Sequence, residues 1–240
     1  MTGADWLSYS LQDFLMFSPE VFLRLYVRLN QDIWPGQWVL VLLALAVPWL
    51  LTRTKRSLRR GGVGLVALAW IGCGLGFLWR YYGEIFWPAL WFGGFFVAQG
   101  LLLAFVGLFS SIRQTEGGRT GTVAWFVGGW LGAIVLLPWL TVLQSGQVQA
   151  LAIYGLFPET TVAACTLVLV FVPRTWRWPL LILPTMWALF SAATYWALQL
   201  PWLQGYPVAT LVSVGLALWL SPRPAQSRGR QFAHRGPVRR

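Results

Sequence analysis

The sequence predicts an all-α fold, namely a polytopic membrane helical bundle of about seven transmembrane helices preceded by an amphipathic N-terminal helix. Three observations support this prediction. Of the 240 residues, 57% are hydrophobic and only 10% are charged, whereas soluble proteins carry about 25% charged residues. Apolar runs close to the ~20 residues that cross a hydrocarbon core about 30 Å thick follow one another with short polar gaps. No segment alternates with the period of two typical of membrane strands, so we expect helices.

Hydropathy divides the apolar part of the chain into seven segments joined by short connections. The expected spans are residues 37–52, 62–79, 85–109, 121–143, 148–172, 179–198 and 205–220. The chain is therefore expected to comprise an N-terminal region on the outer face (1–36), the helical bundle (37–220) and a basic cytoplasmic tail (221–240).

The distribution of basic residues predicts the orientation of the bundle, because short loops rich in Lys and Arg stay cytoplasmic. The connections after the first, third, fifth and seventh spans hold most of the 18 basic residues. The opposite side keeps only Arg24, Arg28 and Arg80, together with five acidic residues. We therefore expect the N-terminus outside, the C-terminus inside, and a location in the bacterial cytoplasmic (inner) membrane with the lipid bilayer as partner.

The N-terminal region contains the signature of a helix start at Ser18-Pro19-Glu20, with Ser as N-cap and Pro at the first helical position. The charged residues that follow recur every four positions and are expected to form one narrow polar stripe with acid–base pairs at i,i+4. They are Glu20, Arg24, Arg28 and Asp32. The helix is expected to lie at the outer interface or pack its apolar face on the bundle. Alternatively, it enters the membrane as a short eighth element whose stripe lines a polar crevice.

The C-terminal tail SPRPAQSRGRQFAHRGPVRR is poor in apolar residues and is expected to be disordered. Its six arginines either serve as a topology anchor or bind anionic lipid headgroups, at about 1 kcal/mol per basic residue near a charged surface. Nucleic acid is an unlikely partner for this tail.

The sequence lacks the residues that most catalytic and metal sites require. The only histidine, His234, lies in the tail, no aspartate falls in a span, and no P-loop pattern occurs. Cys73 and Cys165 are expected at similar depths on different spans, where packing explains them better than a metal or redox pair. We therefore expect no cofactor and no metal, and the sequence favours a non-enzymatic protein without deciding the question.

The stretch YGLFPETT interrupts the fifth apolar segment with an acidic residue. Pro158 suits the first helical position and Glu159 the second, so the segment is expected to break at residues 155–158, after a shallow lead-in formed by 148–157. Counted from Arg174 at about 1.5 Å per residue, Glu159 lies roughly 22 Å across the membrane, near its outer boundary.

Two interpretations of Glu159 follow. In the first, Glu159, Thr160 and Thr161, together with Gln99, Gln144 or Gln147, form an outward-facing site for an ion or solute on a broken helix. In the second, Glu159 is a structural helix-start acid in contact with water at the outer interface.

Three stretches of the chain resemble an uncharacterised family of bacterial polytopic membrane proteins, a domain of unknown function. They are SYSLQDFLMFSPEVFLRLYVRLNQDIWP, YGLFPETTVAACTLVLVF and PLLILPTMWALFSAATYWALQLPWLQGYP. In that family the tract near Glu159 carries a Pro-Cys-Pro-Thr run, of which only Pro158 and Thr161 are present here. The resemblance implies a membrane location and a fold, and it implies neither an activity nor thiol chemistry at this tract.

The leading functional hypothesis is a transporter-like protein that moves a small solute or ion, with the site around Glu159. The alternative is a non-catalytic accessory or scaffold subunit of a membrane complex, acting with a membrane-protein partner or as a homo-oligomer. Small-residue spacings such as Gly72 with Gly76 and Gly128 with Gly132 favour close helix packing and support this alternative. An enzyme acting on lipids is the weakest of the three hypotheses, because no catalytic constellation is visible.

Overall fold

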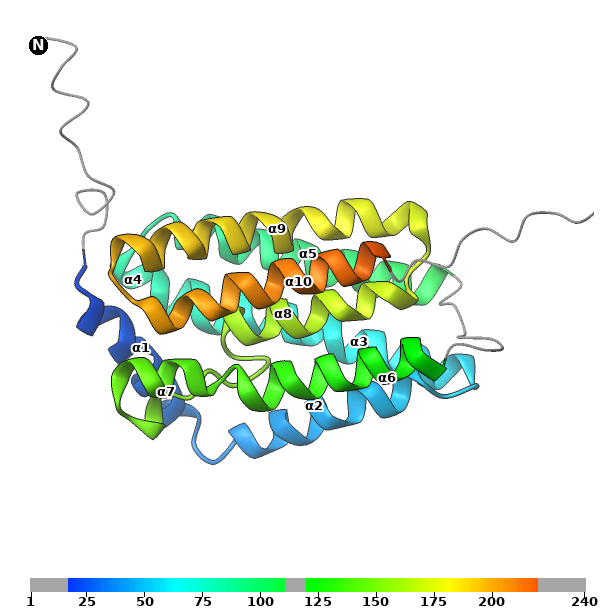
Figure 1. The fold of residues 1–240 in the computed structure, drawn as a ribbon, viewed down its shortest axis with the longest axis horizontal. Helices are drawn as coiled ribbons and strands as arrows, with labels where there is room; N and C mark the ends of the chain where they lie inside the picture. Colours follow the sequence, from blue (N-terminus) through cyan, green and yellow to red (C-terminus); the bar gives the residue numbers. More distant parts are fainter. Residues whose placement is uncertain (1–16, 111–119, 220–240) are drawn as a thin grey trace, which may run out of the picture.

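The computed structural model of the chain describes residues 17–110 and 120–219. Throughout these residues the chain forms helices and their connections, with no strand among them. Figure 1 shows the longer helices lying side by side along one axis, with α1 placed across one end. The predicted all-α bundle is confirmed for this part of the chain, whereas the basic tail at 221–240 lies outside the described residues.

The elements follow one another without any inserted domain. In chain order the α-helices are α1 (Pro19–Ile33), α2 (Gln37–Leu51), α3 (Arg56–Gly72), α4 (Gly83–Ile85), α5 (Ala89–Phe109), α6 (Thr120–Leu131), α7 (Trp139–Ser145), α8 (Pro158–Val168), α9 (Arg174–Ala197) and α10 (Gly205–Trp219). Between them lie the π-helical η3 (Cys73–Tyr82) and η4 (Gly132–Leu136) and the 3₁₀ turns η5 (Val148–Ala150), η6 (Leu169–Phe171) and η7 (Pro201–Gln204).

Four helices in the described residues are long and apolar enough to cross a membrane. They are Arg56–Ile85, Ala89–Phe109, Gly121–Ser145 and Arg174–Ala197, and the bent pair formed by α1 and α2 is a fifth candidate. These helices are typical of a multi-pass membrane protein. The predicted set of seven separate spans is not reached by helix length, because α2 and α10 have 15 residues each and α8 with η6 has 14. A crossing needs about 20 residues.

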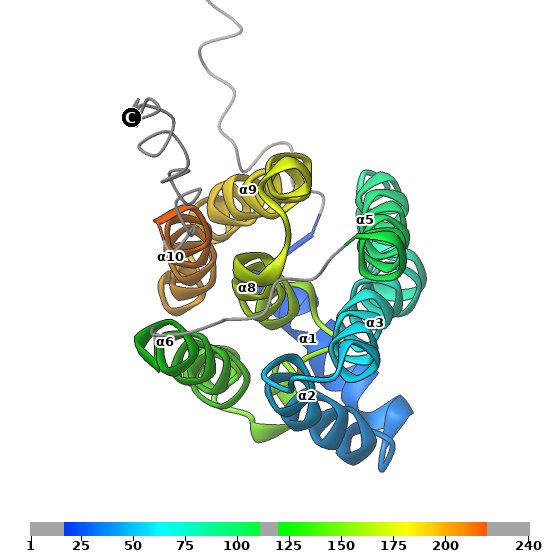
Figure 2. The ribbon, with the colours of Figure 1, turned by 90° about the vertical axis from the view of Figure 1, so that its right-hand side faces the viewer.

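The shortest of these apolar segments lies at the centre of the bundle. Figure 2 shows α8 surrounded by α2, α3, α5, α6, α9 and α10. Every residue of α8 is buried, whereas the other long helices each expose large apolar side chains on their outer faces. Helix α8 is therefore a core element whose contacts are with protein.

Helix α1 lies across the end of the bundle, at 97° to α2. Its N-cap is Ser18, whose hydroxyl accepts from the backbone N–H of Val21 at 3.4 Å. The apolar face of α1, including Phe22, Tyr26 and Leu29, is buried against the bundle, and the predicted stripe from Glu20 to Asp32 is exposed. The structure therefore agrees with the surface-packed arrangement, in which α1 packs its apolar face on the bundle and leaves the stripe exposed.

Two arginines that the sequence places in cytoplasmic connections are instead buried. Arg59, 7% exposed, donates to the carbonyls of Arg53 and Thr54 just beyond the end of α2. Arg177, 2% exposed, donates to the carbonyls of Val170 and Val172 near η6. It also donates to the carbonyl of Ala217 in α10 at 2.9 Å. Because carbonyls at helix ends lack partners within the helix, these arginines have a structural role in addition to their charge.

Replacing Arg177 by Met should lower the free energy of unfolding by about 3 kcal/mol, because three buried carbonyls lose charged donors worth roughly 1.5–3 kcal/mol each and partly find other partners. The measurement is unfolding of the purified full-length chain in mixed micelles. Arg174→Met is the matched control, since Arg174 is exposed three residues earlier on the same helix. Equal stability of the two variants would contradict the capping role.

Candidate functional site

The chain reaches α8 through a non-helical lead-in that two threonines hold in place. Gly155 has a φ of +82°, a conformation that glycine adopts without strain, and α8 then begins at Pro158. The Thr161 hydroxyl accepts from the N–H of Gly155 at 2.8 Å, and the Thr160 hydroxyl donates to the carbonyl of Ala152 at 2.6 Å. The break predicted at 155–158 is therefore confirmed.

Glu159 lies inside the protein at the first turn of α8. It is 2% exposed, and its Oε1 accepts a hydrogen bond from the hydroxyl of Tyr195 in α9 at 2.8 Å. Its Oε2 is buried and has no hydrogen-bond partner among the described residues. One oxygen of the carboxyl group is therefore positioned by Tyr195, and the other is buried without a well-formed hydrogen bond.

Three further tyrosines surround this carboxyl group. Tyr26 from α1, Tyr82 from η3 and Tyr206 from α10 are all buried, and each interacts electrostatically with Glu159. None of these three hydroxyls forms a well-aligned hydrogen bond within the described part of the chain, although that of Tyr26 approaches the Glu159 carboxyl group. Together with Tyr195, these residues form what we call the tyrosine cage.

Aromatic packing fixes the positions of the cage. The ring of Tyr26 stacks on Phe157 with a centroid distance of 4.5 Å, which places α1 directly against the start of α8. Phe22 contacts both Tyr82 and Tyr195, at 5.6 and 6.0 Å between ring centroids. Aromatic pairs at such distances are attractive beyond their buried area, so α1 closes the cage from the end of the bundle.

No basic side chain among the described residues neutralises the Glu159 carboxyl group in the cage. The one ion pair in the described residues is on the surface, between Arg28 and Glu84 at 2.9 Å, so no basic side chain pairs with Glu159. No cluster of three or more His, Cys, Asp or Glu suited to a metal occurs in the same residues. A charged group buried without a partner is costly, so this carboxyl group is suited to binding a proton or a small monovalent cation among hydroxyl oxygens.

The structure corrects the predicted surroundings of Glu159. Both interpretations of the sequence placed it in contact with outside water, but α1 and the tyrosines cover it. Thr160 and Thr161 are adjacent to it, yet their hydroxyls hold the lead-in and are not free. The site is thus closed in this conformation.

Gln99 is separate from the Glu159 centre. It lies on α5, where its Nε2 donates to the carbonyl of Leu180 at 2.7 Å. Leu180 and Tyr195 are fifteen residues apart on α9, or about 22 Å at 1.5 Å per residue. The grouping of Gln99 with Glu159 was therefore wrong, because a single sequence does not show the level at which two helices contact each other.

The other two glutamines lie near α1. Gln144 accepts from the N–H of Trp202 at 3.1 Å. Both Gln144 and Gln147 line a polar groove of about 530 Å³ between α1, α7 and residues 198–200, which also includes Glu20 and Arg24. This groove lies beside α1 at the end of the bundle.

The polar stripe on α1 makes its contacts with a different element. Instead of pairing with Asp32 along the helix, Arg28 pairs with Glu84, and Asp32 accepts from the hydroxyl of Tyr81 at 2.6 Å. Neither predicted i,i+4 pair occurs among the described ion pairs, and Arg28 and Asp32 instead bond to residues of the neighbouring η3–α4 segment. The stripe therefore ties α1 to the bundle.

The two cysteines are both buried on the side of α8 that faces the lead-in. Cys73 donates to the Thr161 hydroxyl at 3.2 Å, and Cys165 lies 3.5 Å from the hydroxyl of Tyr154. Each thiol is thus occupied in packing and weak hydrogen bonding, and both are free of disulfides.

Sequence reasoning missed the tyrosine cage. Its four members come from α1, η3, α9 and α10, and no spacing in the sequence connects them. The one available signal was a tyrosine in an otherwise apolar helix face, as at Tyr26 and Tyr195, and that signal is weak because buried tyrosines are common.

The fold and the site together define a class of protein: an all-helical bundle in which four of the described helices are long and apolar enough to cross a membrane, with a carboxyl group buried at the start of its central helix. The chain belongs to a family of unknown function (DUF6064), whose model matches residues 19–228. The match begins with α1 and includes every described helix, and it confirms the resemblance to an uncharacterised family. Neither a curated protein nor a solved structure matches the chain.

Replacing Thr161 by Val should lower the free energy of unfolding by about 1–3 kcal/mol, because the buried N–H of Gly155 would lose its acceptor. Thr166→Val is the matched control, since Thr166 is equally buried on α8 but bonds only to the carbonyl of Val162 in its own helix. Unfolding of both variants in micelles tests this expectation. A loss no larger for Thr161→Val than for the control would contradict the role of Thr161 in holding the lead-in.

Proposed function

We propose that this protein is a transporter-like protein of the membrane that moves a small solute or ion, with a proton or small monovalent cation bound at Glu159. The observation that carries the proposal is a buried carboxyl group that has no basic partner among the described residues and is surrounded by the hydroxyls of four tyrosines. Intramembrane acidic residues at interrupted helices are typical of ion and solute sites.

The position of the carboxyl group supports the same proposal. Glu159 lies in the first turn of α8, where the backbone N–H groups and the helix dipole favour a negative charge. These groups offset part of the cost of burying the charged form of Glu159. A centre buried on all sides needs a moving element, and α1 is the natural candidate because it covers the cage with one face and exposes the other.

The orientation and location remain part of the proposal. The N-terminal region is placed outside and the C-terminal tail inside the bacterial inner membrane, on the basis of the basic residues in alternate connections. In this orientation α1, the polar groove and the lead-in all face outward, so an ion would reach Glu159 from outside when α1 moves.

Flux measurements test the proposed function. Purified protein is reconstituted into liposomes that contain a pH-sensitive dye, and gradients of pH, Na⁺ or K⁺ are imposed at a clamped membrane potential. We expect the wild type to carry a flux above that of empty liposomes and Glu159→Gln to reduce it at least tenfold, because the amide keeps the shape but holds no charge.

The control is Glu20→Gln, since Glu20 is an exposed acid outside the cage that forms no ion pair among the described residues, and its variant should retain the flux. An unchanged flux in Glu159→Gln would contradict the proposed site. The absence of flux in every protein sample, combined with co-purification of a stable membrane partner, would favour the accessory-subunit alternative instead.

Labelling with a membrane-impermeant thiol reagent tests the orientation. In a background in which Cys73 and Cys165 are replaced by Ala, we expect Gln147→Cys to react in intact cells and Arg56→Cys to react only after lysis. Both positions are exposed in the structure, at opposite ends of the bundle. The reverse pattern would overturn the proposed orientation.

A further inference from the structure

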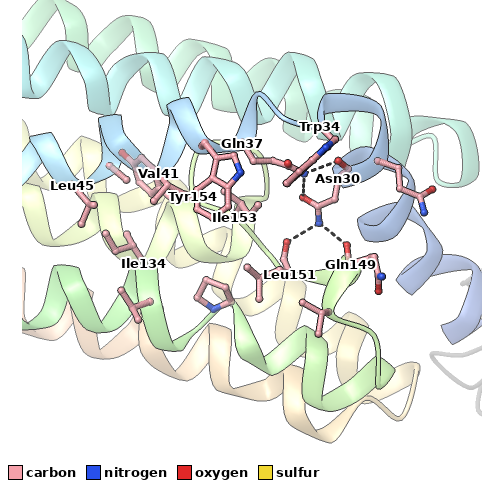
Figure 3. A pocket seen from close by; sticks show the side chains of 16 residues that line it. Asn30, Trp34, Gln37, Val41, Leu45, Ile134, Gln149, Leu151, Ile153 and Tyr154 are labelled. Atoms are coloured by element: carbon pink, nitrogen blue, oxygen red, sulfur yellow. Dashed lines mark hydrogen bonds between the residues drawn. The ribbon is translucent and has the colours of Figure 1, made fainter.

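A second hollow of the molecule, separate from the Glu159 centre, is a groove of about 600 Å³. It lies between α2, the π-helical η4 and the lead-in to α8, and it is bounded at one end by the last turn of α1. None of the side chains that line it is charged. Figure 3 shows Asn30, Gln37 and Gln149 at one end, and Leu45 and Ile134 toward the other. The groove is therefore amphipathic along its length.

Hydrogen bonds organise the polar end and leave one acceptor unused. Asn30 donates to the carbonyls of Gln149 and Leu151 at 2.8 and 2.9 Å, which joins α1 to the lead-in. Gln37 donates from Nε2 to the carbonyl of Asn30 at 2.6 Å. Its Oε1 has no partner, although Gln37 is only 7% exposed. A buried acceptor without a donor is unfavourable, so a ligand that offers an O–H or N–H would be stabilised here.

The length of the groove matches one leaflet of a membrane. From Gln37 to Leu45, α2 rises by about 12 Å at 1.5 Å per residue, compared with about 15 Å for half of a hydrocarbon core. Trp34 and Trp38 beside the polar end are 65% and 60% exposed, as is typical of tryptophans at a membrane interface. The polar end therefore lies at the level of the headgroups and the apolar end within the hydrocarbon.

The size and lining of the groove suit a small lipid. A volume of about 600 Å³ falls within the range of roughly 300–1,000 Å³ that small-molecule pockets occupy. The lining also lacks a cation that could pair with a phosphate, so a neutral headgroup fits better than an anionic one.

We propose that this groove is a binding site for a neutral membrane amphiphile, such as a monoacylglycerol or a long-chain alcohol. Its hydroxyl donates to Oε1 of Gln37, and its hydrocarbon tail lies between α2 and η4 toward Leu45 and Ile134. This inference is independent of the proposed function, since it rests on different residues and requires no ion at Glu159.

Photolabelling tests the site in the full-length protein, reconstituted in nanodiscs of phosphatidylcholine. The probe is a monoacylglycerol with a diazirine in its tail. We expect adducts on the faces of α2 and η4 that line the groove. Unlabelled monoacylglycerol should compete at least tenfold better than the methyl ester of the same chain length, which has no donor. Gln37→Leu should abolish this difference between competitors.

Variants that fill the groove provide the second readout. Ile134→Trp and Val41→Phe should each reduce labelling at least fivefold, whereas Leu42→Trp should leave it unchanged, because Leu42 is 67% exposed on α2 and lies outside the groove. Each variant must elute as a single species in size-exclusion chromatography. Equal labelling of filled and control variants would indicate surface lipid only, and a co-purified polypeptide that blocks labelling would identify a protein occupant; either result overturns the proposal.

Discussion

The structure depends on hydrogen-bond partners for the backbone N–H and C=O groups of one irregular segment, the lead-in to α8, inside an apolar helical bundle. In an apolar medium every N–H and C=O needs a partner, so non-helical backbone is tolerated at this depth only where protein surrounds it. The lead-in to α8 meets this requirement through Thr160, Thr161 and Asn30, which bond to the N–H or carbonyls of residues 149–155. The helices around α8 bury the last part of this segment, residues 154–157. The Glu159 centre and the amphipathic groove both exist because the lead-in is held in this way.

The lead-in also connects the two sites that the structure contains. Its first residues line the groove, and its last residues position Glu159 at the start of α8. Helix α1 contacts both regions, through Asn30 at the groove and through Tyr26 at the tyrosine cage. A displacement of α1 would therefore expose the carboxyl group and change the polar end of the groove together. In physical terms, an amphiphile bound in the groove and an ion bound at Glu159 would be linked through one helix, provided that each binds differently to the two positions of α1.

Two buried arginines, Arg59 and Arg177, have a structural role that a count of basic residues does not reveal. Arg59 and Arg177 contribute to the asymmetry of basic residues from which the orientation is inferred. In the structure their guanidinium groups bond to carbonyls beyond helix ends, where planar donors are well suited to several acceptors at once. Arg59 and Arg177 thus contribute both to the asymmetry of basic charge and to the bonding of carbonyls near helix ends. Their burial close to the helix ends is compatible with the orientation inferred from that asymmetry.

The sequence by itself determined the all-helical class, the family, the amphipathic α1 and the break before Pro158. These features depend on local periodicity, on composition and on the fixed φ of proline, which are properties of neighbouring residues. Only the tertiary structure decided that Glu159 is enclosed by four tyrosines, that Gln99 is distant from it, and that the stripe on α1 bonds to Tyr81 and Glu84. Those outcomes depend on the level and rotation at which helices far apart in the chain contact one another. Apolar faces of similar composition can pack at several such levels, so hydropathy carries little information about which one is adopted.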